Sequence, residues 1–324
     1  MKRALLWSVV LIAGLGGCLA VATPSAAPKD QAPGAWKTLT PMPTARQEVA
    51  VAEAGGKVYV IGGYGEWYEP TDAVEVYDPA RDLWESKSPL PIAVHHPAAV
   101  GLNGKIYAMG GFTGRLFQNP QQTLFEYDPA VGSWRHRASM LSARGALAAT
   151  VLNGKIHALG GAAKQSLSAH EVYDPVTDRW SRANAMPTAR DHLAAVALDG
   201  KVYAIGGRES FFGEKYSNVE IYDPGTDSWR TGAPLPLGRG GLAAAALQGR
   251  IFIFGGELPF KIVNATEMYD PATDRWTAKA AMPTARHGMG AAAVGPRIYV
   301  PGGGTRPGPG RSSVLEAFEP CGGS

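Results

Sequence analysis

Short apolar runs, separated by glycine, asparagine, aspartate and proline, follow one another along most of this chain. The run Leu193–Leu198 has mainly small side chains, and Asp199-Gly200 separates it from a second run that ends in a glycine pair. A third run ends in Tyr222-Asp223-Pro224, and a fourth carries Trp229. Runs of this length bounded by turn-forming residues predict four short β-strands, which we name a to d in chain order.

The turn residues between these strands fit their positions. Asn103-Gly104, Asn153-Gly154 and Asp199-Gly200 are pairs that tolerate positive φ, which two-residue hairpins require. After strand c, aspartate accepts a turn hydrogen bond and proline presets φ for a type I turn. The sequence therefore predicts tight a–b and c–d turns in an antiparallel sheet.

The four-strand unit recurs along the chain. Tyrosine precedes tryptophan by 7 residues, and only the stretch between the glycine pair and the tyrosine changes in length. The glycine pairs begin at Gly62, Gly110, Gly160, Gly206, Gly255 and Gly302. A repeat with a period of 46 to 50 residues indicates six copies of one structural unit.

The first and last copies are incomplete in a complementary way. No tryptophan follows Phe318, whereas Trp36 precedes Arg46 by the same 10 residues that separate these two positions in later copies. We therefore expect the segment Trp36–Leu39 to supply strand d of the last copy. This pairing closes a ring and removes two sheet edges.

The glycine pair, the Tyr–Trp spacing and an arginine before strand a resemble kelch repeats from residue 36 to residue 320. This resemblance implies one all-β domain, a six-bladed propeller with four antiparallel strands per blade. Three positions depart from the repeat: Val94 replaces the arginine, Gly295-Pro296 replaces a turn pair, and Phe318-Glu319 replaces Tyr-Asp. None of these changes alters the expected fold.

The N-terminus has the layout of a secretory signal, since Lys2 and Arg3 precede the apolar run Ala4–Leu15. Leu15-Gly16-Gly17-Cys18 resembles a bacterial lipobox, which implies a signal of residues 1–18 and a lipid anchor on Cys18. The alternative is ordinary cleavage after Ala22, which would leave a periplasmic or secreted protein. Mass spectrometry of the mature N-terminus distinguishes the two.

The segments beside the propeller contain little else. Residues 19–35 are rich in alanine and proline and read as a flexible tether, and residues 321–324 are a short tail. Cys321 has no partner in the mature chain once Cys18 is acylated or removed, so we expect no intrachain disulfide.

Charge and motifs exclude several function classes. Of 31 basic residues, two lie in the signal, which leaves 29 against 28 acidic residues. This balance does not favour a nucleic-acid partner, and we expect membrane contact only through Cys18. The chain has no P-loop, dinucleotide fingerprint or Cys-x-x-Cys pair, so no cofactor is expected.

The b–c and d–a connections emerge on the same face of an antiparallel blade. The connections of variable length therefore lie together, and this loop face is the expected binding surface.

The arginines before strand a lie near the axis on this face. Converging guanidiniums suit a carboxylate, sulfate or phosphate ligand. The alternative is that they pair with backbone carbonyls or acids of their own blades. The arginines are Arg46, Arg144, Arg190, Arg239 and Arg286.

The two residues after each arginine position include histidines in alternate copies: His95, His96, His192 and His287. If they point into the channel mouth they could bind a metal, or His192 could act as an acid or base with Glu48 or Asp191. The alternative is that they are satisfied polar residues at strand starts. No fixed ligand spacing supports a metal, so none is expected.

The variable loops hold aromatic and polar residues that suit sugar faces or peptide side chains. The alternative is that the rings fold back over their own loops. The candidates are Tyr64, Trp67, Tyr68, Phe112, Arg208, Phe211 and Phe212.

Together these features predict an exported binding protein that recognises a protein or an acidic glycan through the loop face. The sequence shows no clear catalytic constellation. The alternative rests on the resemblance, because some kelch propellers are enzymes, including six-bladed sialic-acid epimerases. Mutarotation of a sugar needs only a proton donor and acceptor near the anomeric centre, which His192 with Glu48 or Asp191 could supply.

Overall fold

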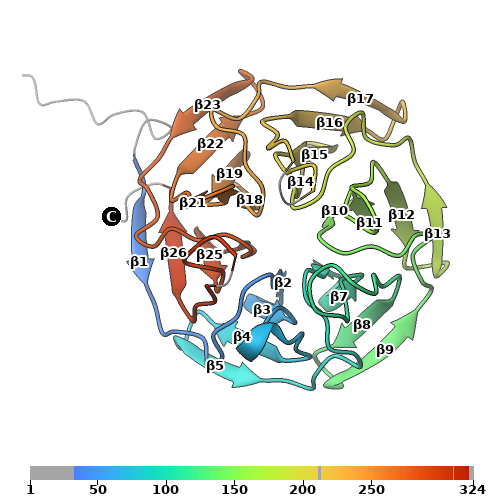
Figure 1. The fold of residues 1–324 in the computed structure, drawn as a ribbon, viewed down its shortest axis with the longest axis vertical. Helices are drawn as coiled ribbons and strands as arrows, with labels where there is room; N and C mark the ends of the chain where they lie inside the picture. The colour runs from blue at the N-terminus through green and yellow to red at the C-terminus, as the bar shows by residue number, and fades with distance from the viewer. Residues whose placement is uncertain (1–32, 211–212, 309, 321–324) are drawn as a thin grey trace, which may run out of the picture.

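The computed structural model describes residues 33–320 apart from 211, 212 and 309, and it forms a ring of six antiparallel sheets around a central axis (Figure 1). Each sheet is one blade of four strands, as predicted from the repeat. Successive blades follow one another around the ring in chain order. The fold is therefore an all-β six-bladed propeller.

The first three blades share one strand order from the axis outward. Blade one comprises β2 (Ala50–Ala54), β3 (Lys57–Ile61), β4 (Val74–Asp78) and β5 (Leu83–Ser86). Blade two comprises β6 (Ala98–Leu102), β7 (Lys105–Met109), β8 (Leu124–Asp128) and β9 (Ser133–Arg137). Blade three comprises β10 (Ala148–Leu152), β11 (Lys155–Leu159), β12 (His170–Asp174) and β13 (Arg179–Arg182).

The remaining blades have the same order. Blade four comprises β14 (Ala194–Leu198), β15 (Lys201–Ile205), β16 (Val219–Asp223) and β17 (Ser228–Thr231). Blade five comprises β18 (Ala243–Leu247), β19 (Arg250–Phe254), β22 (Thr266–Asp270) and β23 (Arg275–Ala278), and its b–c loop holds a small hairpin of β20 (Glu257–Leu258) and β21 (Lys261–Ile262). Blade six comprises β24 (Ala292–Val294), β25 (Arg297–Pro301), β26 (Leu315–Glu319) and β1 (Ala35–Thr38). A 3-10 turn, η2 (Glu66–Tyr68), lies in the b–c loop of blade one.

Ring closure by the N-terminal strand is confirmed. β1 pairs antiparallel with β26, and Trp36 lies opposite Phe318 in the register. Figure 1 shows the blue β1 at the outer edge of the red blade six. The two ends of the propeller are thus joined in one sheet.

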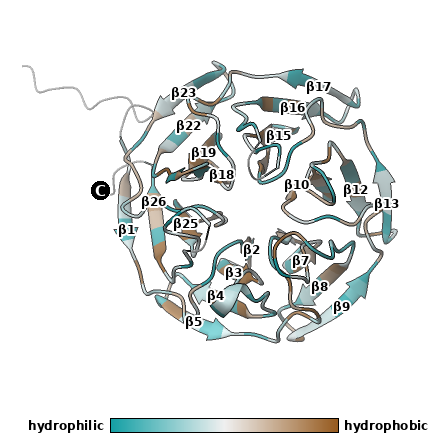
Figure 2. Ribbon diagram, viewed as in Figure 1, coloured by the Kyte–Doolittle hydropathy of each residue, from teal (hydrophilic) through white to brown (hydrophobic). Residues whose placement is uncertain are grey.

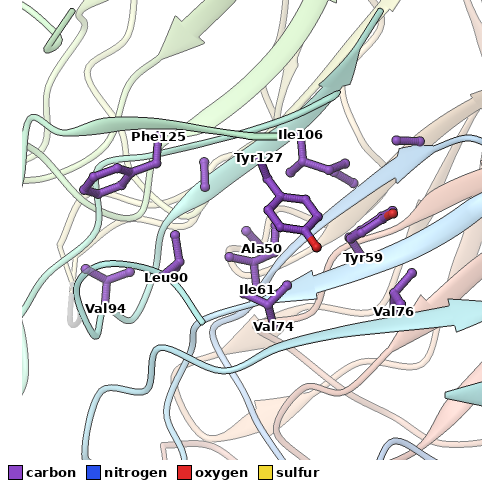
Figure 3. Close-up of a cluster of buried hydrophobic side chains, with 13 residues drawn as sticks. Ala50, Tyr59, Ile61, Val74, Val76, Leu90, Val94, Ile106, Phe125 and Tyr127 are labelled. Atoms are coloured by element: carbon purple, nitrogen blue, oxygen red, sulfur yellow. The ribbon is translucent and has the colours of Figure 1, made fainter. Parts of the chain in front are cut away.

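The core lies between blades. Figure 2 shows hydrophilic colour on outer strands such as β13 and β17 and hydrophobic colour further inside the blades. In the cluster of Figure 3, Tyr59 and Ile61 from blade one pack with Ile106 and Tyr127 from blade two. Strand a is built from small residues because the blades converge at the axis, where little width remains.

The Tyr–Trp spacing of the repeat is explained by contacts within and between blades. In blade four, Tyr222 lies opposite Trp229, and its hydroxyl donates to Asp227 Oδ1 at 2.7 Å. The indole Nε1 of Trp229 donates to the Asn184 carbonyl of the preceding blade at 2.8 Å. The same indole bond recurs in all six blades, from Trp36, Trp84, Trp134, Trp180, Trp229 and Trp276.

Blade three buries a pair of histidines, His157 and His170, whose Nδ1 and Nε2 atoms lie 2.9 Å apart. Burial lowers the pKa of each imidazole to about 4. The unfolded chain therefore binds more protons than the folded chain between pH 4 and about 6.5. Stability that is complete above this range is lost as the pH falls through it.

We expect the free energy of unfolding to fall by about 2–4 kcal/mol between pH 7 and pH 5 through this pair. Urea unfolding at several pH values measures it. The matched variant is His157→Tyr with His170→Val, the residues that blade one has there as Tyr59 and Val74. Its pH dependence should be clearly shallower, although buried His95 still contributes in the same direction. The assignment to His157 and His170 would be contradicted if the free energy of unfolding fell equally steeply with pH in both proteins.

Candidate functional site

The d–a and b–c connections contact each other in every blade, on one face of the ring. The residue after the arginine position forms an isolated antiparallel bridge with the start of the b–c loop. The bridges are Gln47 to Tyr64, His95 to Phe112, Gly145 to Ala162, Asp191 to Arg208, Gly240 to Glu257, and His287 to Gly304. The loop face predicted from chain topology is thus built by six equivalent pairs of connections.

The five arginines of the repeat are buried inside the blades, with no exposed surface. Arg46 Nη2 lies 2.8 Å from Glu75 Oε2, and Arg46 Nη1 donates to the carbonyl of Gly62 at 2.7 Å. Arg144, Arg190, Arg239 and Arg286 pair in the same way with Glu171, Glu220, Glu267 and Glu316. The expectation of a guanidinium ring at the channel mouth is therefore corrected, because these cations face strand c of their own blade and not a ligand.

Blade two lacks both members of this pair. Val94 stands where the other blades have arginine, and Phe125 stands at the strand c position of Glu75. Both side chains belong to one apolar cluster with Leu90 (Figure 3). An apolar pair thus replaces a buried ion pair, a substitution that proteins tolerate when both partners change together.

A closed ring of six backbone hydrogen bonds encircles the axis just inside the loop face. In each blade the second residue after the arginine position donates its N–H to the corresponding carbonyl of the preceding blade, at 2.6 to 2.9 Å. The six residues are Glu48, His96, Ala146, His192, Gly241 and Gly288. We call them the axial ring.

Residues of the axial ring have left-handed backbones. The φ values of Glu48, His96 and His192 are 53°, 54° and 52°, which side chains with a Cβ seldom adopt. One atom each of their side chains converges to within 4.8 Å of the others. A cavity of about 80 Å³ opens at this level, lined by the axial ring and the residues that follow it.

Charged side chains surround this cluster. Arg208 donates through Nη2 to His192 Nε2 at 2.9 Å, and its guanidinium also pairs with Asp191 and Glu257. His287 Nδ1 lies 3.4 Å from Glu48 Oε1. Arg208 is only 2% exposed, so it serves this buried network instead of the loop surface on which we expected it.

Burial and neighbouring charges shift the pKa values of several side chains in this cluster. Burial favours the neutral form of Glu48, yet the protonated His287 beside it holds the pKa of this carboxyl well below its usual range. Burial lowers the pKa of His96 well below its usual range. Burial opposes the charge of His287, but its contact with Glu48 outweighs this and raises the pKa. Burial also favours the neutral form of Asp191, but the hydrogen bond from His192 outweighs it and lowers the pKa of this carboxyl.

His95 points away from the axis, although it precedes His96 in the same dipeptide. Its ring stacks between Tyr64, at a centroid distance of 3.9 Å, and Phe112, at 5.3 Å. Tyr64 is 6% exposed and Phe112 is fully buried. Phe112 therefore folds back into the loop base, whereas Tyr64 is largely covered by this stack and still borders the pocket between blades one and six.

A pocket of about 700 Å³ opens on the loop face between the b–c loops of blades one and six. Its wall includes three of the predicted ligand-binding residues, Tyr64, Trp67 and Tyr68. Arg306 and Arg311 also line it, and Gln47 ties the two loops together by accepting from Gly310 N at 2.8 Å. The sequence reasoning missed both arginines, which lie in a glycine- and proline-rich connection.

The remaining candidates lie elsewhere. Phe211 and Phe212 fall outside the described residues, as do Cys18, Cys321 and the signal segment 1–18. Within the described part of the chain, no helix has the length and apolar character needed to cross a membrane.

The comparisons with known proteins agree with this architecture. The Kelch motif model matches residues 45–91, 93–141 and 143–187, and the model of the KLHDC2/KLHL20/DRC7 Kelch-repeats domain matches residues 181–303. A solved structure, that of YjhT, superposes with a TM-score of 0.70 at 18% identity, covering 86% of this chain and 96% of YjhT. No curated protein is similar enough in sequence to count as a relative. The chain belongs to the kelch-repeat β-propeller family.

Proposed function

We propose that this kelch propeller is an exported binding protein that recognises an acidic glycan in the pocket between blades one and six. The observation that carries the proposal is the combination, in one pocket of about 700 Å³, of an exposed indole with two arginines. Ligand sites commonly have volumes of roughly 300–1,000 Å³ and pair apolar surfaces with a few polar groups.

Trp67 supplies the apolar surface. Its side chain is 82% exposed, and both Trp67 and Tyr68 have positive φ, at 54° and 58°. Consecutive residues in this strained region commonly mark functional loops. An exposed indole offers a flat face on which a sugar ring can stack.

The polar groups of the pocket favour an anionic ligand. Arg311 lies 3.6 Å from Glu66, a long ion pair in which both side chains remain substantially exposed. A carboxylate on the ligand would pair with the exposed guanidinium of Arg311.

We expect Trp67→Ala to weaken binding of an acidic glycan by about fivefold or more, because stacking on one aromatic ring contributes roughly 1 kcal/mol or more. A glycan array identifies the ligand, and isothermal titration calorimetry measures its affinity. Phe260→Ala is the matched control, since Phe260 is an equally exposed aromatic, at 87%, on the loop of blade five. Arg311→Gln should weaken acidic glycans more than neutral ones.

Three results would refute this assignment. The first is equal binding by all three variants and the unmodified protein. The second is a loss of binding in Phe260→Ala alone, which would move the site to blade five. The third is binding of peptides but not of glycans, which would favour a protein partner on the same face.

Export and anchoring are the second part of the proposal. The basic residues Lys2 and Arg3, the apolar run behind them and the sequence around Cys18 support a lipoprotein signal. In this arrangement Cys18 carries the lipid, and residues 19–34 tether the propeller to a bacterial membrane.

A further inference from the structure

Three possible metal ligands meet at the axis. They occupy the same repeat position in blades one, two and four, where Glu48, His96 and His192 converge. The other three members of the axial ring are alanine or glycine, which leave the centre to these side chains. A Cβ on Gly288 would lie 2.5 Å from the Glu48 carboxylate, so the glycine there makes room for it.

Hydrogen bonds assign the tautomer of His96. The Gly114 carbonyl can only accept, so His95 Nε2, 2.9 Å away, carries a proton. The Nδ1 atom of neutral His95 then carries a lone pair, and it accepts a hydrogen bond from the Nδ1–H group of His96 at 2.5 Å. In a neutral His96 imidazole, the Nε2 atom therefore also carries a lone pair.

This lone pair of His96 lies 3.2 Å from the carboxylate oxygen Oε2 of Glu48. The atom is buried, on a side chain that is 4% exposed, and it has no hydrogen-bond partner among the described residues. Two electron-rich atoms thus face each other without a proton between them. Such a contact is unfavourable unless a positive charge, either a proton or a metal ion, lies between the two atoms.

The His192 imidazole is oriented in the same way. Its Nδ1 donates to Asp191 Oδ1 at 2.5 Å, which leaves Nε2 as a lone pair. A carboxylate behind an imidazole is the usual support of a metal-binding histidine. Arg208 donates to this Nε2 through Nη2, so a metal ion at His192 must displace that one bond, whereas the pairs of Arg208 with Asp191 and Glu257 use Nε and Nη1.

We propose that Glu48, His96 and His192 bind a divalent transition-metal ion, such as Zn²⁺, at the centre of the axial ring. Two neutral imidazole nitrogens and one carboxylate oxygen are a donor set that suits this ion. Asp191 and His95 orient the two imidazoles from behind. The adjoining cavity of about 80 Å³ leaves space for water or a ligand oxygen to complete the coordination.

The test uses the full, tag-free chain, stripped with a chelator and titrated with Zn²⁺ by isothermal titration calorimetry. We expect one equivalent to bind, and we expect His96→Gln and Glu48→Gln each to weaken binding by about 100-fold or more, because loss of even a partner that only orients a ligand costs roughly 10–100-fold. His136→Gln is the matched control, because His136 lies exposed on the outer strand β9 and should leave the affinity unchanged. Co²⁺ provides a second readout through visible absorption that reports imidazole ligation.

Two outcomes overturn the site: no stoichiometric binding by the unmodified chain, or equal affinity in the His96→Gln, Glu48→Gln and His136→Gln proteins. Melting curves of the stripped proteins check that each variant folds. If His96→Gln fails to fold, His192→Gln replaces it, and an unchanged Co²⁺ spectrum in that variant would also exclude the proposed ligands.

Discussion

Replacing Glu75 with phenylalanine is expected to lower the free energy of unfolding by about 3–5 kcal/mol, because it leaves the guanidinium of Arg46 buried and unpaired. Arg46 has no exposed surface and cannot reach water without opening the blade. Its bonds to the carbonyls of Gly62 and Ala73 would remain, but neither carbonyl carries a compensating charge. Urea denaturation of the two proteins measures the difference.

The double variant Arg46→Val with Glu75→Phe reproduces the pair that blade two has as Val94 and Phe125. It should recover at least half of the lost stability, since the unpaired charge is then removed. If the single variant is as stable as the unmodified protein, the ion pair between Arg46 and Glu75 does not stabilise the blade. If the double variant is no better than the single one, the apolar pair of blade two depends on its own surroundings.

Deleting residues 1–39 is expected to have the larger effect and to lower the melting temperature sharply. This deletion removes β1 and exposes the edge of β26 along its whole register. It also removes Trp36, whose ring contacts Phe254 and Phe318 and whose Nε1 donates to the Ala280 carbonyl at 2.8 Å. Loss of one such side chain alone costs roughly 3 kcal/mol, and the strand pairing adds to it.

Deletion of residues 1–32 is the matched control, because it leaves β1 and all of these contacts in place. Differential scanning calorimetry measures the melting temperature of both truncated proteins. The difference between them is the contribution of β1 to stability, apart from any effect of residues 1–32. A melting temperature that is the same in both proteins would mean that the ring does not need β1 to hold its last blade.

The fold could be predicted because each repeated residue has a contact that recurs from blade to blade. The indole bond between blades and the Tyr–Trp pair fix the spacing of 7 residues, so the spacing itself revealed the strands. The N-terminal strand was predictable for the same reason, since Trp36 stands at the correct distance from Arg46. The recurrence of these spacings in six copies identified the strands and their order, which the residue pattern of one strand alone does not.

The role of the arginines could not be read from their own spacing, which does not say where a side chain points. A signal was nevertheless present in the chain. Each arginine accompanies a glutamate two residues before the Tyr or Phe of strand c, and the copy with Val94 has Phe125 in that place. The copy that lacks the arginine thus also lacks the glutamate. This joint replacement indicates that the two side chains contact each other within a blade and that the arginine does not bind a ligand.

The axial site was only partly predictable. His95 and His96 are adjacent and chemically identical, yet only His96 faces the axis, because a left-handed backbone at the second residue redirects its side chain. The pocket arginines were missed because the segment 305–311 carries no repeat signal. Side-chain direction at strained positions and the course of irregular loops are set by tertiary contacts, which a pattern along the chain does not encode.

The closed ring of backbone hydrogen bonds acts as a fixed collar on the central channel. Because each peptide is bonded to its neighbour on both sides, the collar cannot dilate without breaking these bonds. The cavity at the axial ring measures only about 80 Å³, and one of about 360 Å³ is lined by the innermost strands. The cavity at the axial ring is far smaller than the roughly 300–1,000 Å³ of a typical ligand site, so we expect a sugar or a peptide to bind above the axial ring, on the loop face.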